Sequence, residues 1–150
     1  MNGQQFQAVF EKIYPENLAY KWDNVGLQIG TLDKDISNVL LSLDLTLDVL
    51  KEAIKNNCNL IVVHHPMIFS PIKKIVTDTY QGKLIEFALK NDIAVYVAHT
   101  NFDIGNEGMN KILADLIGLK DQEIIDYTTE FEGLGRIGTI DTIDFSKCIE

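Results

Sequence analysis

The three histidines of this chain all stand at the ends of apolar runs, and together they could bind a metal ion. His64 and His65 directly follow one apolar run, and His99 follows the next, with Asp103 four residues further along. Imidazole and carboxylate groups are common protein ligands of Zn, Fe, Mn and Ni. Two ions close together could clamp an oxygen-containing substrate and activate water, with Asp103 bridging them.

Each of these side chains also has an alternative role. Adjacent residues of a regular strand point to opposite faces, so His64 and His65 could share one ion only if the chain turned before Pro66. Each could otherwise serve a different ion, or both could simply cap the sheet through backbone hydrogen bonds. His99 could be a ligand, a strand cap, or a residue that orients Asp103 or bound water, and we favour the last of these. Asp44 is expected to cap a helix or form a turn, with contact to a metal ligand as the alternative.

The elements that must position these residues follow from the hydrophobic pattern. Helical spacing of apolar residues alternates with short continuous apolar runs. Helices are expected over 4–14, 46–56, 79–91 and 109–116, and strands over 39–43, 60–63 and 93–98. Buried strands that alternate with helices indicate parallel βαβ units, so we predict an α/β fold whose central, mostly parallel sheet is flanked by helices.

This fold would bring the candidate ligands together. Right-handed crossovers leave the carboxyl ends of parallel strands at one edge of the sheet, where open α/β sheets bind their ligands. Asp44, the His64-His65 pair and the segment from His99 to Asp103 each follow one of the expected strands. The sequence therefore predicts that they meet at this edge.

Other segments carry weaker patterns. Residues 19–30 contain turn-forming residues and are expected to be irregular, and 121–132 is polar and acidic. The loose alternation over 134–143 suggests an edge or antiparallel strand, and 144–150 suggests the start of another helix. The length and a hydrophobic content of 46% predict a single domain over residues 1–150.

Composition excludes some functions. A net charge of −9 and a pI of about 4.7 argue against a general nucleic-acid or anionic-membrane binder. No apolar run approaches the ~20 residues of a membrane span, and the first residues do not resemble a signal peptide. Cys58 and Cys148 have no metal or redox spacing, and we expect Cys58 to be packed. We expect a cytoplasmic protein.

Three further motifs have competing interpretations. Residues 133–138 match G-x-G-x-x-G, but no strand precedes and no helix follows, so we reject a dinucleotide site. Lys73 and Lys74 could meet an anionic substrate, although solvated lysines are the more common case. Trp22 could line a pocket together with Asp23 and Asn24, or could anchor the core while the two polar residues form a turn.

Several blocks of the sequence together resemble the NIF3-like family, also called YbgI or DUF34, whose members often carry the name "GTP cyclohydrolase 1 type 2 homolog". The resemblance extends in order over nearly the whole chain. The blocks are 22–30, 43–46, 63–69, 99–103 and 135–138.

The resemblance implies a dinuclear metal site within an α/β fold, and toroidal hexamers built from dimers. Carried over to this chain, the family's ligands fall on His64, His65 and Asp103, which would hold up to two divalent ions such as Zn, Fe, Mn or Ni. The family's remaining His and Glu ligands come from a C-terminal half. Because no histidine follows His99, we expect this chain to be the N-terminal portion of a longer member.

Two hypotheses about function follow. The first is a metal-dependent hydrolase that acts on a nucleotide or other small molecule, with His99 relaying protons. The second is a non-catalytic module that binds metal or a protein partner in a regulatory role.

Overall fold

The computed structural model describes residues 1–141 of the chain. The chain divides into two compact units, Met1–Phe102 and Asp103–Glu150.

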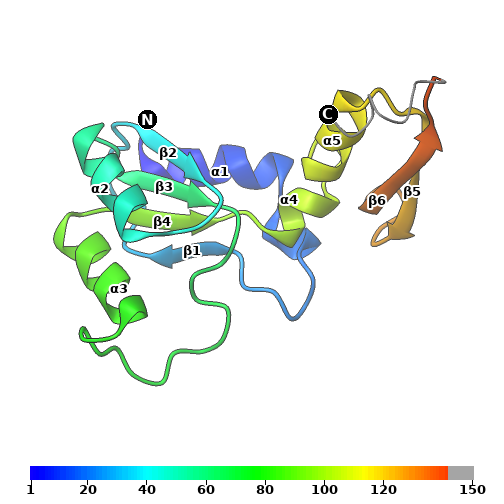
Figure 1. The fold of residues 1–150 in the computed structure, drawn as a ribbon. Coiled ribbons are helices and arrows are strands. Elements are labelled where there is room, and N and C mark those ends of the chain that lie inside the picture. The colour runs from blue at the N-terminus through cyan, green and yellow to red at the C-terminus, as the bar shows by residue number, and fades with distance from the viewer. Residues whose placement is uncertain (142–150) are drawn as a thin grey trace. The chain divides into compact units, whose positions relative to one another are not determined.

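The first unit is built on a four-stranded sheet with the order β1-β4-β3-β2 (Figure 1). β2 (Val39–Ser42), β3 (Leu60–Val63) and β4 (Ala94–Val97) run parallel, and β1 (Gly26–Ile29) pairs antiparallel with β4. The predicted mostly parallel α/β sheet is confirmed. Strand β1 was not predicted, because it lies inside residues 19–30, which we expected to be irregular.

Helices cover both faces of this sheet. α2 (Leu47–Lys55) and α3 (Tyr80–Lys90) pack on one face, where Leu50 and Leu84 meet the side chains of Ile61 and Val95. α1 (Gly3–Ile13) lies on the other face, where Phe6 and Phe10 pack against Leu60, Val62 and Tyr96. The central strands β3 and β4 are buried along their whole length, as expected of a sheet that is covered on both sides.

Side-chain caps set the starts of the helices. The Thr46 hydroxyl accepts a hydrogen bond from Val49 N at 3.2 Å, and the Thr79 hydroxyl accepts one from Gly82 N at 3.0 Å. Such caps pair backbone N–H groups that have no partner within the helix. The predicted helices are confirmed within a residue or two. The cap of α2 is Thr46, so Asp44 does not cap the helix and lies instead in the bend before it, which is the other half of its predicted role.

The second unit contains α5 (Met109–Leu116) and a hairpin of β5 (Lys120–Tyr127) and β6 (Gly133–Thr139). The short helix α4 (Thr100–Ile104) crosses the boundary between the units. β5 occupies the acidic stretch for which no element was expected, and β6 is the predicted antiparallel strand. The end of that predicted strand and the expected helix over 144–150 lie outside the described residues. Residues 133–138 form strand β6, which is not the loop that a dinucleotide site requires.

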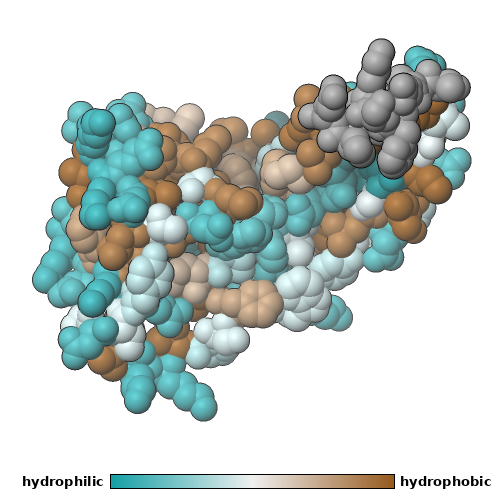
Figure 2. All heavy atoms as spheres, in the orientation of Figure 1, coloured by the Kyte–Doolittle hydropathy of each residue, from teal (hydrophilic) through white to brown (hydrophobic). Residues whose placement is uncertain are grey.

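Hydrophilic residues gather over α2 (Figure 2), and no helix within residues 1–141 is long and apolar enough to cross a membrane. Cys58 is buried, which confirms its expected packing.

Candidate metal centre

The three histidine rings meet where the parallel strands end. β3 ends at Val63 and the chain then bends, so the rings of His64 and His65 lie on neighbouring positions with centroids 5.1 Å apart. The His99 ring, which follows β4, lies 5.1 Å from His64 and 5.9 Å from His65. The predicted convergence at the sheet edge is thus confirmed, and the bend after β3 overcomes the alternation of a regular strand.

Each ring is held through its Nδ1 atom. His64 Nδ1 lies 2.9 Å from the Ala98 carbonyl, His65 Nδ1 lies 2.8 Å from Asp44 Oδ1, and His99 Nδ1 lies 3.0 Å from both Asp23 oxygens. Carbonyl and ionised carboxyl oxygens only accept hydrogen bonds, so Nδ1 must donate in all three cases. In a neutral imidazole this places the lone pair on Nε2. A histidine whose other nitrogen donates to a carbonyl or carboxylate is the usual arrangement around a protein-bound metal.

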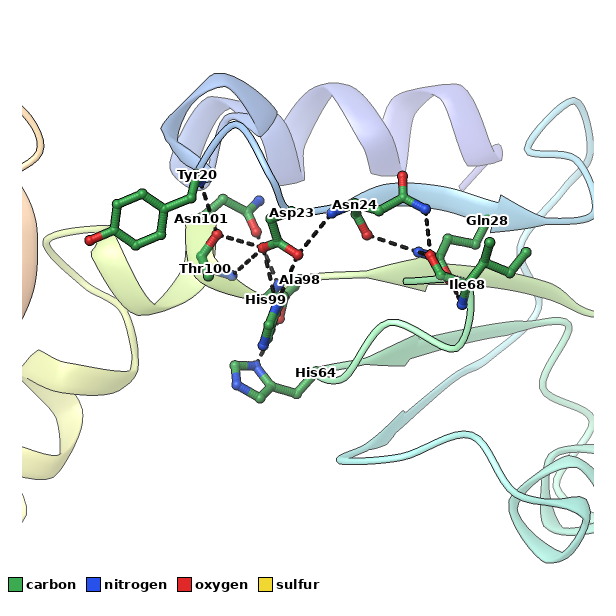
Figure 3. A network of polar contacts seen from close by, with 10 residues as sticks. All are labelled: Tyr20, Asp23, Asn24, Gln28, His64, Ile68, Ala98, His99, Thr100 and Asn101. Atoms are coloured by element: carbon green, nitrogen blue, oxygen red, sulfur yellow. Dashed lines mark hydrogen bonds and ion pairs between the residues drawn. The ribbon is translucent and has the colours of Figure 1, made fainter. Parts of the chain in front are cut away.

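Asp23 is the centre of the polar network around His99 (Figure 3). Its side chain is fully buried and accepts hydrogen bonds from Thr100 N at 3.1 Å, Thr100 Oγ1 at 2.5 Å and Asn24 N at 2.8 Å, besides His99. Burial alone raises the pKa of a carboxyl group, but the hydrogen bonds from Thr100, His99 and Asn24 outweigh it and hold the pKa of Asp23 below its usual value. His99 therefore faces a fixed carboxylate.

The position of Asp23 follows from the pairing of β1 with β4. The register matches Gly26 with Val97, so continuing it by three residues beyond the strands places Asp23 opposite Thr100. From the sequence, Asp23 was expected only as a turn or pocket residue. An antiparallel partner for β4 was the missing information, because it alone brings residues 23 and 99 together.

Asp44 makes the corresponding contact with His65. It lies in the bend between β2 and α2, and its carboxylate accepts from His65 Nδ1, which is the alternative role that the sequence suggested. The two side chains are 59% and 49% exposed, whereas those of Asp23 and His99 are 0% and 18% exposed. The His99–Asp23 pair is therefore shielded from water and the His65–Asp44 pair is not.

A group of three side chains has the spacing of a metal site. His64, His99 and Asp103 each offer one ligand atom, and these atoms lie within 4.8 Å of one another. Asp103 reaches this position through α4, one helical turn after Thr100. The structure thus brings together the predicted ligands His64 and Asp103, and the third member is His99, for which an orienting role was favoured. His65 stands beside the group, and its role as a ligand stays a prediction.

Trp22 does not anchor the core, since its side chain is 58% exposed. Its ring stacks on Tyr20 and contacts Phe69 and His99. Lys73 and Lys74 are exposed, in agreement with solvated lysines.

An α/β sheet with histidines and carboxylates gathered at its strand ends defines a class of candidate metal-binding protein. Comparison with known families identifies the family: the sequence profile of the Duf34/NIF3 (NGG1p interacting factor 3) family matches residues 1–150. The chain belongs to the Duf34/NIF3 family.

Individual relatives support the assignment. The chain is 48% identical over 128 residues to the "GTP cyclohydrolase 1 type 2 homolog" of Halalkalibacterium halodurans, which covers 85% of this chain and 34% of the relative. A crystal structure of a Bacillus cereus protein related to NIF3 matches with a TM-score of 0.83 and 46% identity, over 86% of this chain and 35% of that one. The Staphylococcus aureus hypothetical protein SA1388 matches with a TM-score of 0.90 and 28% identity, over 99% and 62%. The chain therefore spans about a third of the length of curated relatives such as the Halalkalibacterium halodurans protein.

Proposed function

We propose that this chain forms the metal-holding part of a metal-dependent hydrolase. His64, His99 and Asp103 would hold a divalent ion, and His65 would serve the same ion or a second one beside it. The observation that carries the proposal is that the Nδ1 atoms of all three histidines are tied to acceptors at the edge where Asp103 also lies.

The donor set fits such an ion. Two imidazole nitrogens and one carboxylate suit Zn, Fe, Mn or Ni, and leave room for further ligands. A divalent ion bound there would supply charge stabilisation and an activated water for hydrolysis. The partly buried position of the three donors limits competition from bulk water.

The chain's own residues would contribute orientation and proton transfer. The Asp23 carboxylate accepts the hydrogen bond from His99 Nδ1 and so fixes the ring, with the lone pair of the neutral imidazole on Nε2, which suits His99 either as a ligand or as the proton relay that the sequence suggested. Asp44 would do the same for His65, in a more solvated setting.

The wider expectations form part of this proposal. They are a nucleotide or other small-molecule substrate, a homo-oligomer such as the family hexamer, and a cytoplasmic location. Residues 1–150 would be one domain of a longer protein, whose remainder would complete a dinuclear site. The relatives' name, "GTP cyclohydrolase 1 type 2 homolog", agrees with hydrolytic chemistry on a nucleotide.

The first test is metal binding by the full chain. Zn²⁺ and Mn²⁺ affinities are measured by isothermal titration for the wild type and for His64→Ala, His65→Ala, His99→Ala and Asp103→Ala. Asp48→Ala is the control, because that carboxylate is 90% exposed and lies on α2. We expect stoichiometric binding that His64→Ala and Asp103→Ala abolish and Asp48→Ala leaves unchanged. Equal, weak binding by wild type and all variants would refute the proposal.

The second test separates catalysis from binding alone. Metal-loaded full-length protein is screened for hydrolysis of nucleotides and phosphate esters. Turnover that the ligand variants remove, and Asp48→Ala does not, supports a hydrolase. Tight metal binding without turnover supports the non-catalytic regulatory module instead.

A further inference from the structure

Three aromatic side chains, of which Trp22 and Phe69 are exposed and Tyr20 is half-buried, lie together beside the histidines. Tyr20 and Trp22 stack with their centroids 5.5 Å apart and their planes 18° apart, and Phe69 lies 5.9 Å from Trp22. Trp22 is 58% exposed and Phe69 is 52% exposed. Large apolar side chains are usually exposed singly, so this exposed Trp22–Phe69 pair with Tyr20 stacked behind it, here called the aromatic platform, needs an explanation.

Hydrogen bonds hold the Tyr20 and Trp22 side of the platform in place. Tyr20 N donates to Thr100 Oγ1 at 3.1 Å, and Asp23 N donates to the Tyr20 carbonyl at 2.9 Å. The next side chain, Asp23, is fully buried in its network with Thr100 and His99. Trp22 is therefore exposed on a backbone that is fixed on both sides.

The Phe69 side is fixed independently. Ile68 N donates to Gln28 Oε1 at 2.8 Å, while the Ile68 carbonyl accepts from Gln28 Nε2 at 3.0 Å and from Asn24 Nδ2 at 2.5 Å (Figure 3). These bonds join the segment after the histidine pair to β1 and to the turn that carries Trp22. The same short stretch, 20–28, thus positions all three rings.

The platform adjoins the candidate metal ligands. The Trp22 and His99 rings meet edge to face, with centroids 6.4 Å apart. A ligand that covers Trp22 therefore lies next to the donors that would hold the metal. Rigid, exposed aromatic rings bind flat rings at little entropic cost, and a metal beside them attracts anionic oxygen groups.

We propose that the aromatic platform binds the planar heteroaromatic ring of a nucleotide-like substrate by stacking. This inference rests on the proposed function, because the metal ligands would then receive the substrate's phosphate or another oxygen group. It assigns the Tyr20–Trp22–Phe69 surface a role in substrate selection that is separate from metal binding.

Trp22 is the sole tryptophan of the chain, so its fluorescence reports directly on stacking. Adenosine 5′-monophosphate is titrated into the full chain in EDTA and again with Zn²⁺. Ribose 5-phosphate, which lacks the base, is the matched probe. We expect saturable quenching by adenosine 5′-monophosphate in both conditions, tighter with Zn²⁺, and none by ribose 5-phosphate.

Substitutions then locate the stacking surface. Phe69→Ala should weaken the binding of adenosine 5′-monophosphate about five- to tenfold, as expected for the loss of one base–aromatic contact. Phe131→Ala is the control, because Phe131 is 68% exposed and lies outside the platform. Circular dichroism checks that both variants are folded, and Phe69→Leu provides a second variant that keeps apolar bulk but removes the aromatic ring.

The outcomes separate this inference from the proposed function. If the chain binds no metal but adenosine 5′-monophosphate still quenches Trp22 fluorescence in EDTA, the metal proposal fails and the platform proposal is supported. Three results would overturn the platform proposal. They are metal binding without quenching by adenosine 5′-monophosphate, equal quenching by ribose 5-phosphate, and an equal loss of affinity for adenosine 5′-monophosphate in Phe69→Ala and Phe131→Ala.

Discussion

The substitution Asp23→Asn tests whether the buried carboxylate prepares His99 for metal binding. The Asp23 oxygens accept from His99 Nδ1, from Thr100 N and Oγ1, and from Asn24 N. Asparagine keeps the shape but carries no charge and offers a single oxygen. It can keep the contacts with Thr100, but its amide nitrogen then faces the N–H of Asn24.

The magnitude follows from these contacts. Loss of a group that orients a metal-bound histidine typically costs about 10–100-fold in metal affinity, and because one oxygen remains we expect about tenfold. Loss of the hydrogen bond from Asn24 N, which belongs to an exposed residue, should lower the free energy of unfolding by about 0.5–1.5 kcal/mol. For Asp44→Asn we expect about a threefold loss of affinity at most, because the exposed His65–Asp44 pair is screened by water.

The assay is isothermal titration of Zn²⁺ into the wild type, Asp23→Asn, Asp44→Asn and the control Asp48→Asn. It is run well below the midpoint of thermal unfolding of the least stable variant, so that all four proteins are folded. We expect the loss to be largest for Asp23→Asn, smaller for Asp44→Asn and absent for Asp48→Asn. Unchanged affinity in a folded Asp23→Asn variant would refute the claim that Asp23 orients a ligand.

Three further predictions concern stability. Asn101 is fully buried, accepts a hydrogen bond from His99 N and donates one to the Tyr14 carbonyl. Asn101→Ala should therefore lower the free energy of unfolding, measured with urea, by about 1–3 kcal/mol for each hydrogen bond lost. An unchanged free energy of unfolding would contradict these hydrogen bonds. Leu50→Ala, at a fully buried position, should cost about 2–5 kcal/mol in the same assay, and a smaller loss would argue against its place in the core. Burial, and then a neighbouring carboxylate, raise the pKa of Glu16 above 4.5, so the free energy of unfolding should fall as pH rises through that raised pKa. Glu16→Gln should flatten this fall between acid and neutral pH, and an unchanged profile would count against the effect.

The fold was predictable where burial dominates. Strands β2, β3 and β4 and helices α2, α3 and α5 carry continuous or helically spaced apolar residues, and the structure has all of them. β1 was missed because it is a four-residue strand among turn-forming residues, and its pairing with β4 is far away in the sequence. β5 was missed because it is acidic and mostly exposed, so cross-strand pairing with β6 stabilises it more than burial does.

The same contrast applies to the site. The meeting of His64, His65 and His99 follows from parallel strands that end at one edge, and local pattern was enough to predict it. The contact of Asp23 with His99 depends on the antiparallel β1, which no local pattern indicated. The grouping of His99 with His64 and Asp103 depends on α4, a five-residue helix that the sequence analysis did not predict.

The most direct test of the account is the tautomer and metal response of the three histidines. Long-range ¹H–¹⁵N NMR of uniformly labelled protein resolves both ring nitrogens, and the chain has only three histidines to assign. The account predicts that neutral His64, His65 and His99 all carry their proton on Nδ1. It also predicts that one equivalent of Zn²⁺ shifts the Nε2 signals of His64 and His99. Protons on Nε2, or Nε2 signals that Zn²⁺ leaves unchanged, would contradict it.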